Sequence, residues 1–401
     1  MELYLQFGYG MMSLSKELFN RWDGGTVILS PRDLKPTQLE KFSEEISGVK
    51  GSVLLDPQFY LPHADHGKLT THSFWPDSYN TTTFWSSSNL VRMLKEIIDI
   101  NNRLGCRMVI LPGVHVSSVD DMWIGMQEAV FNAIEHIGGL NTEAFATVAL
   151  SEDILRQKDQ INLLLEEIDH WPVSGIYLVC EHPRGNYLVE DPGWLSNVLD
   201  LSAGIRLTGK RLIVGYCNHQ MLYLAASGAD AIASGTWMNV RSFPPAKFMD
   251  AINDEIRQRA VWYYCPTALS EYKLPTLDIA QRLGILDLLK APEDIESEYA
   301  ENIFSGSAPS VSGFSEREAF RHYLNCLKQQ VDMSSASSFR DTLTVQRNLL
   351  NDANSLLIDL HDNDIRGQQR DFRGCIDSSM VALRVLEKER GAIMQRMWST
   401  L

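Results

Sequence analysis

Eight short apolar segments, separated by helix-length stretches, constrain the fold of this chain more than any other feature of its sequence. Most are apolar on successive residues, which is typical of strands covered on both faces of a parallel sheet. Several end directly in polar residues, as 52–55 does before Asp56 and 175–180 does before Glu181. The pattern predicts an α/β fold, a (β/α)8 barrel whose parallel strands deliver polar side chains to one face. The predicted strands are 4–8, 26–29, 52–55, 107–111, 144–150, 175–180, 211–215 and 231–234.

The alternation of strands and helices stops near residue 245 and divides the chain there. Residues 1–245 are predicted to form the barrel, and residues 246–304 a helical extension that packs on it. A linker rich in Ser, Gly and Pro is expected over 305–314. Residues 315–401 are predicted to form a mainly helical C-terminal domain. The predicted helices are 90–104, 120–137, 151–168, 246–260, 277–289, 315–332, 338–361 and 369–398.

The segment between Asp56 and Asn89 lacks helical spacing and is rich in His, Thr, Ser, Trp and Pro. A polar, aromatic loop of this length after a barrel strand is typical of a lid or a binding loop. We therefore expect this segment to lie over the polar face of the barrel.

The net charge of −15 argues against broad, nonspecific nucleic-acid binding, which needs a positive surface, and leaves room for a local basic groove. The six cysteines form no CxxC pair, which favours a reducing compartment. The N-terminus lacks a signal-peptide pattern, and no segment reaches the roughly 18 apolar residues of a membrane span. We expect a cytoplasmic protein with no membrane attachment, and the sequence carries no nucleotide-cofactor motif.

Asp56 and Glu181 are the catalytic candidates at the predicted strand ends. Asp56 can act as a general base, bind the donor edge of a nucleobase or bind a metal, or it can form an Asx turn beside Pro57. Glu181 can serve as a base. Adjacent residues on an extended backbone point to opposite sides, so Glu181 and His182 are not both expected to face the barrel axis.

Further polar residues at the same rim are candidates for substrate binding. Arg184 can clamp an anion, and Ser234-Gly235-Thr236 can hold a phosphate through backbone N–H groups. Trp237 and Asn239 can reach a base or a phosphate, whereas Asn218 can instead cap the next helix. The substrate-binding candidates are Arg32, Gln58, His115, His182, Arg184, Asn218, His219, Ser234 and Arg241.

His63 and His66, with Asp65 and His72 nearby, form the densest group of possible metal ligands, and zinc is the metal that they suit best. The alternative is an ordinary polar loop. Arg366, Arg370 and Arg373 form a modest basic edge among aspartates, which we interpret as a solvated helix face.

Three stretches of the chain resemble the tRNA-guanine transglycosylase superfamily. Asp56-Pro57-Gln58-Phe59 is similar to its DSGGF-type motif, and 175–181 is similar to its GGLAVGE strand. A later stretch from Val214 to Arg241 is similar to its V-G-x-P region. The resemblance covers residues 50–245 and implies a barrel that exchanges a base in nucleic acid for a 7-deazaguanine.

The chain departs from that family at two places. The family's nucleophilic aspartate aligns with Ala233, or with Ser234 if the register slips by one, and the family's cysteine-rich zinc site is absent. If the family chemistry operates here, the nucleophile must come from elsewhere, and Glu181 and Asp230 are the candidates.

Three hypotheses follow. The first is a transglycosylase-like enzyme that acts on a nucleobase in nucleic acid or in a nucleotide. The second is a metal-dependent hydrolase that uses His63, His66, Glu181 and His182. The third is a catalytically degenerate barrel that binds a protein partner through its C-terminal helices.

Overall fold

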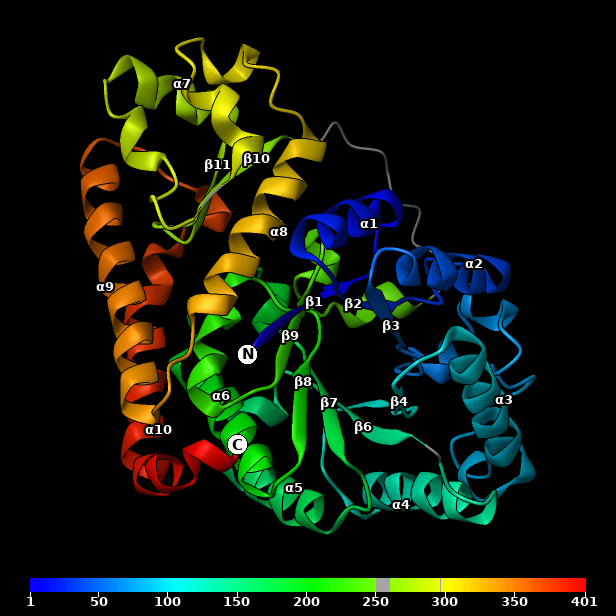
Figure 1. Ribbon diagram of the computed structural model, residues 1–401. Helices are drawn as coiled ribbons and strands as arrows, with labels where there is room; N and C mark the ends of the chain where they lie inside the picture. Colours follow the sequence, from blue (N-terminus) through cyan, green and yellow to red (C-terminus); the bar gives the residue numbers. More distant parts are fainter. Residues whose placement is uncertain (141, 250–259, 296) are drawn as a thin grey trace.

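The computed structural model describes residues 1–140, 142–249, 260–295 and 297–401. Its main sheet joins eight parallel strands in the order β3-β2-β1-β9-β8-β7-β6-β4, and these are the eight segments predicted from the sequence (Figure 1). This order is that of a (β/α)8 barrel, so the predicted fold class is confirmed. A short strand, β5, pairs with the end of β6. The strand bounds are β1 Glu2–Gln6, β2 Gly25–Leu29, β3 Gly51–Leu55, β4 Met108–Ile110, β5 His115–Val116, β6 Glu143–Leu150, β7 Gly175–Cys180, β8 Arg211–Val214 and β9 Ala231–Ser234.

The barrel closes between β3 and β4 through individual hydrogen bonds in place of a strand ladder. Near the start of these strands, Arg107 Nη2 donates to Ser52 Oγ at 2.9 Å and to Thr26 Oγ1 at 3.2 Å. Near their ends, the N–H of His115 donates to the carbonyl oxygen of Tyr60 at 2.9 Å. These contacts form a seam between the two ends of the sheet.

Helices α1 to α6 surround the sheet; α1 to α5 each carry one apolar stripe, whereas α6 is buried on all sides along residues 198–206. In α3, Leu90, Leu94 and Ile97 are buried while Arg92 is exposed. After β8 the outer ring holds a 3-10 segment, His219–Ser227, and all nine of its residues are buried. The helix bounds are α1 Met11–Trp22, α2 Pro36–Ser47, α3 Ser88–Leu104, α4 Asp121–His136, α5 Lys158–His170, α6 Pro192–Leu207, α7 Leu274–Arg282, α8 Glu316–Met333, α9 Phe339–Asp362 and α10 Ile376–Met397.

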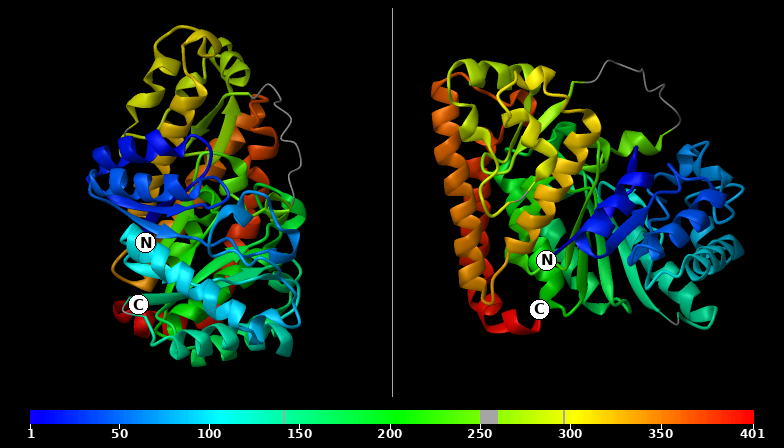
Figure 2. Two further views of the ribbon diagram at one scale, coloured as in Figure 1. Left: turned by 90° about the vertical axis from the view of Figure 1, so that its right-hand side faces the viewer. Right: turned by 45° about the horizontal axis from the view of Figure 1, so that its top comes forward.

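The C-terminal helices cover the part of the barrel that its own helices leave open. α10 runs along α6, α9 lies over His219–Ser227, and α8 packs between β1, α1 and the hairpin of β10 (Trp262–Cys265) and β11 (Ser270–Lys273). Figure 2 shows α9 and α10 side by side along one flank of the barrel. No helix in the described ranges has the length and hydropathy that crossing a bilayer requires.

A buried carboxylate joins α10 to the barrel. Asp200 on α6 is 2% exposed. Lys158 Nζ of α5 donates to Asp200 Oδ2 at 2.8 Å, and Arg390 of α10 donates to both carboxylate oxygens. Residues 305–314, predicted as a linker, pack along α7, where Gln281 Nε2 donates to the carbonyl oxygens of Gly306 and Ser307.

Several helix ends differ from those predicted. The helix predicted from 151 begins at Lys158, because Glu152 bonds to Arg156 and to the N–H of Arg184 in a loop. The helix predicted over 277–289 ends at Arg282, near Gly284, whose φ of +73° suits glycine. The helix predicted from 369 begins at Ile376. The helix predicted over 246–260 starts as a 3-10 turn, Pro245–Phe248, and its residues 250–259 lie outside the described ranges.

The loop between Asp56 and Asn89 packs around one aromatic side chain. The Phe59 ring centroid lies 5.1 Å from that of Trp75, and 5.7 Å from those of Tyr79 and Phe84. Rings at these separations and angles stabilise a cluster beyond their burial. The loop is therefore held in place by its own aromatic core.

We expect Arg390→Ala to lower the free energy of unfolding by about 2 kcal/mol, because the buried Asp200 carboxylate then keeps Lys158 but loses its guanidinium partner. Arg384→Ala, at an exposed position of the same helix, is the matched control and should change that free energy by less than about 0.5 kcal/mol. Urea unfolding followed by circular dichroism and by tryptophan fluorescence measures both. Equal effects of the two substitutions would contradict the structural role of the Asp200 contact.

Candidate functional site

Asp56 follows β3 and lies inside the barrel, where three tyrosine hydroxyls surround one carboxylate oxygen. Asp56 Oδ2 accepts hydrogen bonds from Tyr60 at 2.8 Å, Tyr216 at 3.2 Å and Tyr177 at 3.4 Å. Asp56 Oδ1 accepts the N–H of Gln58 at 2.9 Å. The residue is 1% exposed, so the protein itself occupies both oxygens.

Gln58 connects this carboxylate to the loop after β2. Its side-chain oxygen accepts the N–H of Arg32 at 2.9 Å, and its Nε2 donates to Tyr216 Oη at 3.1 Å. Gln58 adopts a positive φ of 55°, which turns the chain back after β3. Gln58 therefore positions Asp56 and Tyr216, and it is buried away from the rim surface.

Two phenylalanines from the segment after β9 cover the tyrosines. The Phe243 ring centroid lies 5.0 Å from that of Tyr60 and 5.3 Å from that of Tyr216, and Phe248 lies 4.9 Å from Tyr60. We call Tyr60, Tyr216, Phe243 and Phe248 the aromatic layer. The aromatic layer closes the barrel mouth above Asp56.

Burial is the largest cause of the pKa shifts of the ionisable groups below and beside the aromatic layer. Burial raises the pKa of Asp56 to about 6, against the hydrogen bonds from Tyr60 and Gln58, which lower it. Burial likewise lowers the pKa of the Lys247 amine to about 8, although the Asp33 carboxylate opposes this change. The aspartic acid and the lysine therefore both have pKa values closer to neutrality than free side chains.

Glu181 and His115 meet at the end of β7. His115 Nε2 lies 3.2 Å from Glu181 Oε2, which also accepts the N–H of Glu152 at 3.3 Å. Burial opposes ionisation of Glu181, but the contact with His115 outweighs it and lowers the pKa of the carboxyl group. The structure brings these two predicted residues together, beside Phe243 of the aromatic layer.

The other polar residues after β7 and β8 are occupied by local contacts. His182 is buried and its Nδ1 lies 3.0 Å from the Asn186 carbonyl oxygen, whereas Arg184 is exposed. Asn218 caps the 3-10 segment through the N–H of Gln220 at 2.8 Å. His219 lies fully buried among aromatic rings. Of these four predicted substrate-binding residues, the structure leaves Arg184 accessible at the rim.

Asp230 lies at the opposite end of the barrel from Asp56. It precedes β9, and its Oδ2 accepts from Arg206 Nη1 at 2.7 Å and from the N–H of Leu212 at 2.6 Å. The structure therefore does not bring Asp230 to the rim, where the resemblance would have placed a nucleophile. Ser234 is fully buried at the end of β9.

Arg241 is held in a buried network. Its guanidinium lies 3.3 Å from Glu271 Oε1, and it stacks at 3.3 Å over the centroid of the Tyr323 ring. Glu271 also accepts from Arg370 Nη1 at 2.6 Å and from Tyr187 Oη at 2.9 Å. Arg241 is thus joined to the hairpin and to the C-terminal region, and it lines a small cavity of about 170 Å³ together with Glu271 and Arg370.

His63 and His66 do not form a metal site with their neighbours. His63 is exposed and His66 is buried, where its Nδ1 accepts the N–H of Lys68 at 3.2 Å. Among the residues that the structure describes, no group of three or more His, Cys, Asp and Glu side chains is arranged to hold a metal ion. The geometry of this segment fits the alternative interpretation, an ordinary polar loop.

A cleft of about 760 Å³ opens at the C-terminal face of the barrel, beside the aromatic layer. The loop after β1 (residues 7–13), residues 32–34 after β2 and residues 237–239 after β9 form its walls. Lys68, Lys247 and Arg370 also line it. We call it the rim cleft. It lies at the strand ends that barrel enzymes use for their active sites.

Positive charge dominates the rim cleft although the whole chain is acidic. Arg32, Lys68, Lys247 and Arg370 face it, and Asp33 is the carboxylate that the described lining contributes. Asp33 Oδ1 lies 3.1 Å from Arg32 Nη1 and Oδ2 lies 3.7 Å from Lys247 Nζ. The cations exceed the carboxylate in number, so the cleft attracts anions.

An aromatic pair forms one edge of the rim cleft. Tyr9 is 65% exposed, and its ring packs against Trp237 with centroids 5.8 Å apart. Gly10, at a φ of +74°, turns the chain from this loop into α1, a conformation that L side chains rarely adopt. Of the lining residues, the sequence predictions named Arg32, Trp237 and Asn239 as binding candidates and Arg370 as part of a solvated helix face. They missed Tyr9, Asp33, Lys68 and Lys247, although Gly8-Tyr9-Gly10 between a strand and a helix was a usable signal.

Neither a model of a protein family nor a curated protein sequence matches this chain. Solved structures similar to it include a D-psicose 3-epimerase determined in the presence of D-fructose, at 10% identity and a TM-score of 0.28 over 53% of this chain and 84% of that one. A xylose isomerase-like barrel fused to a 4-hydroxyphenylpyruvate dioxygenase matches at 14% identity and a TM-score of 0.33, over 64% and 40% of the two chains. A GH20 β-N-acetylhexosaminidase from Streptomyces coelicolor matches at 9% identity and a TM-score of 0.33, over 63% and 65%. These similarities concern the fold and carry no information on the reaction.

We expect the free energy of unfolding of the wild type to fall by about 3 kcal/mol relative to that of Asp56→Asn as the pH rises from about 4 to about 6. Over this range the folded carboxyl keeps its proton while the unfolded one loses it, so the folded state binds more protons and rising pH favours unfolding. Urea unfolding of both proteins at several pH values measures the difference. Parallel pH profiles would show that Asp56 titrates normally.

Proposed function

We propose that this protein is an enzyme that acts on a nucleotide, free or within a nucleic acid strand, and that the substrate binds in the rim cleft. The observation that carries the proposal is the composition of the cleft, where cations, an aromatic pair whose Tyr9 is exposed and a carboxylate face one space. A nucleotide offers the matching groups: a phosphate, a planar base and a sugar between them.

The cations suit the phosphate. Lys68 is exposed at the cleft edge, and the side chain of Arg370 is held in place by Glu271. A guanidinium that is already fixed in one orientation loses little side-chain entropy when a phosphate binds to it. We therefore assign the phosphate to Lys68 and Arg370, which both line the cleft.

The aromatic pair suits the base. Tyr9 exposes most of its ring, and Trp237 supports it from the side. Stacking of a base on an aromatic side chain contributes about 1–3 kcal/mol and tolerates any base. Asn239, which is exposed beside Trp237, can donate to and accept from a base edge.

The reaction that we propose is cleavage or exchange at the N-glycosidic bond, in keeping with the resemblance of residues 50–245 to base-exchanging barrels. Asp33 supplies the carboxylate that such chemistry needs to stabilise the developing positive charge on the sugar. Asp56, the residue suggested by that resemblance, lies under the aromatic layer and outside the rim cleft. Asp33 therefore replaces Asp56 as the candidate for contact with the reacting sugar.

A binding protein without catalysis is the second candidate. It is favoured by the closed barrel mouth, in which Phe243 and Phe248 cover the interior carboxylate. The two candidates share the ligand and differ in whether the ligand is changed.

We expect guanosine 5′-monophosphate and a short single-stranded RNA to bind to the wild type, and Tyr9→Ala to weaken both about ten-fold because stacking is lost. Tyr9→Phe keeps the ring and should bind normally. Lys68→Ala should weaken binding in a salt-dependent way, whereas Lys95→Ala, at an exposed lysine of α3, is the matched control. Calorimetry and fluorescence anisotropy measure the affinities.

Three outcomes of this titration are informative. Binding of RNA without the mononucleotide identifies a strand as the ligand, and binding of guanosine as tightly as its monophosphate removes the role of the cations. No binding of any of these probes at millimolar concentration overturns the proposal.

We expect Asp33→Asn to abolish the reaction and to keep affinity for guanosine 5′-monophosphate within about three-fold, because an amide keeps the shape of the carboxylate without its charge. Mass spectrometry of nucleosides from cells that express the wild type or the variant measures the reaction. Identical nucleoside profiles for the wild type, the variant and cells without the protein would favour the binding-only candidate.

A further inference from the structure

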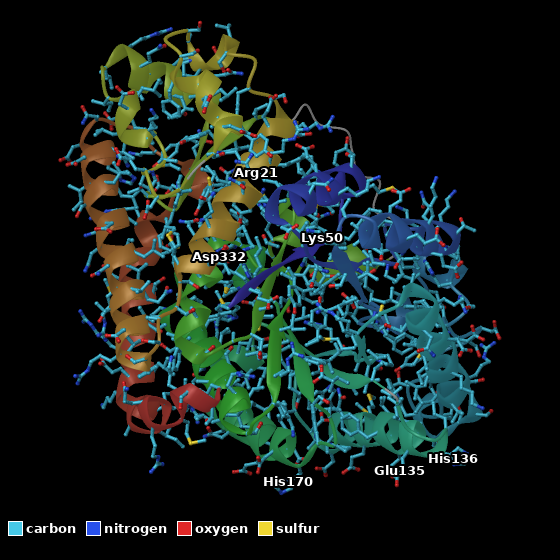
Figure 3. The ribbon with its side chains drawn as sticks, viewed as in Figure 1. Arg21, Lys50, Glu135, His136, His170 and Asp332 are labelled. Carbon is cyan, nitrogen blue, oxygen red and sulfur yellow. The ribbon has the colours of Figure 1, made fainter. Side chains whose placement is uncertain are left out.

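A second cavity, of about 520 Å³, lies away from the rim cleft, between α1, β10, α8 and the segment that precedes α8. Arg21 of α1, labelled in Figure 3, lines one side of it. Ser297 and His322 face the same cavity. Neither residue belongs to the rim or to the proposed nucleotide site.

Ser297 and His322 form a hydrogen-bonded pair. Ser297 Oγ lies 2.6 Å from His322 Nδ1, across 25 residues of sequence. The other ring nitrogen, Nε2, lies 2.7 Å from the carbonyl oxygen of Tyr264. A carbonyl only accepts, so Nε2 carries the proton and Nδ1 presents its lone pair to the serine hydroxyl.

The imidazole is fixed by packing as well as by these bonds. His322 is fully buried on α8, and its ring stacks on that of Tyr263 with centroids 4.9 Å apart and planes at 18°. Burial lowers the pKa of His322 to about 4, so the ring is neutral at physiological pH. Cys326 Sγ lies 3.6 Å from Nδ1, and burial raises the pKa of this thiol, which stays protonated.

We infer that Ser297 is a nucleophile activated by His322, with the Tyr264 carbonyl oxygen orienting the ring, and that this cavity hydrolyses a carboxylic ester with a small apolar acyl group. A serine, a base within hydrogen-bond reach and a third group that orients the base are three of the groups that acyl transfer uses. This inference is independent of the nucleotide site.

The lining of the cavity selects the substrate class. Tyr263, Ile295 and Ala300 are buried and give it an apolar side, which suits the acyl group. The cavity is also lined by charged side chains of both signs, which disfavour a strongly charged ligand: Arg21, Lys290, Glu293, Glu298 and Glu301. A small, neutral ester fits both features.

In the covalent step, Ser297 Oγ attacks the ester carbonyl carbon while its proton passes to His322 Nδ1. The bond from the carbonyl carbon to the alcohol oxygen breaks, and the alcohol leaves with that proton. Water then attacks the acyl-serine by the same route, which releases the carboxylic acid and restores the serine hydroxyl.

The test is labelling of the full-length wild type with a fluorophosphonate probe, which phosphonylates an activated serine and releases fluoride. Peptide mapping by mass spectrometry locates the label. We expect Ser297 to be labelled at least about 100-fold faster than the exposed Ser305 on the same segment, because only the former has a base at hydrogen-bond distance. Ser297→Ala should lose the label and the hydrolysis of p-nitrophenyl acetate, and Ser305→Ala should keep both.

His322→Gln removes the base and should slow labelling of Ser297 about 100-fold in protein that is folded by circular dichroism. If His322→Gln does not fold, the labelling rates of Ser297 and Ser305 in the wild type still test the inference. Absence of label on Ser297, or labelling no faster than that of Ser305, overturns the inference.

Discussion

The buried carboxylate of Glu271 is the contact on which the arrangement of the rim depends. It lies on β11, outside the barrel, and pairs with Arg241 from the end of β9 and with Arg370 from the C-terminal region. Burial opposes its ionisation, but the two guanidinium groups outweigh that cost and lower the pKa of Glu271. Removing one partner would leave a buried charge unpaired, at a high free-energy cost. The network therefore holds together β11, the segment after β9 and the C-terminal region. Arg370 reaches the rim cleft because this carboxylate holds it.

The outer ring of helices explains why the C-terminal region cannot be separated from the barrel. A barrel strand is stable only when helices cover its outer face. After β8 the chain supplies nine buried residues of 3-10 helix, which are too short to cover the sheet alone. α8 packs against β1, α9 packs against this 3-10 segment and α10 packs against α6, and the Asp200 contacts join α10 to α5 and α6. What the sequence presents as an appended helical domain is part of the wall of the barrel.

The sequence predicted all eight strands because each is a compact apolar run, whose burial depends little on distant residues. Glu181 directly follows β7 and His115 begins β5, so the structure brings these two predicted residues together at the strand ends, while their roles stay predictions. Asp56 was predicted to be at the rim, but its cover comes from Phe243 and Phe248, nearly two hundred residues away. Arg370 was interpreted as solvated because its partner, Glu271, lies 99 residues away in the sequence. Contacts between residues so far apart in the sequence form only in the folded chain, so no local sequence pattern predicts them.

The seam between β3 and β4 has a mechanical consequence for the barrel. A continuous strand ladder must break many cooperative hydrogen bonds to open, whereas here Arg107 and the His115 N–H supply separate bonds at the two ends. Each of these hydrogen bonds contributes about 1 kcal/mol, so the hydrogen bonds across this seam oppose widening of the barrel less than a strand ladder would. Tyr60 belongs both to this seam, through its carbonyl oxygen, and to the aromatic layer, through its ring.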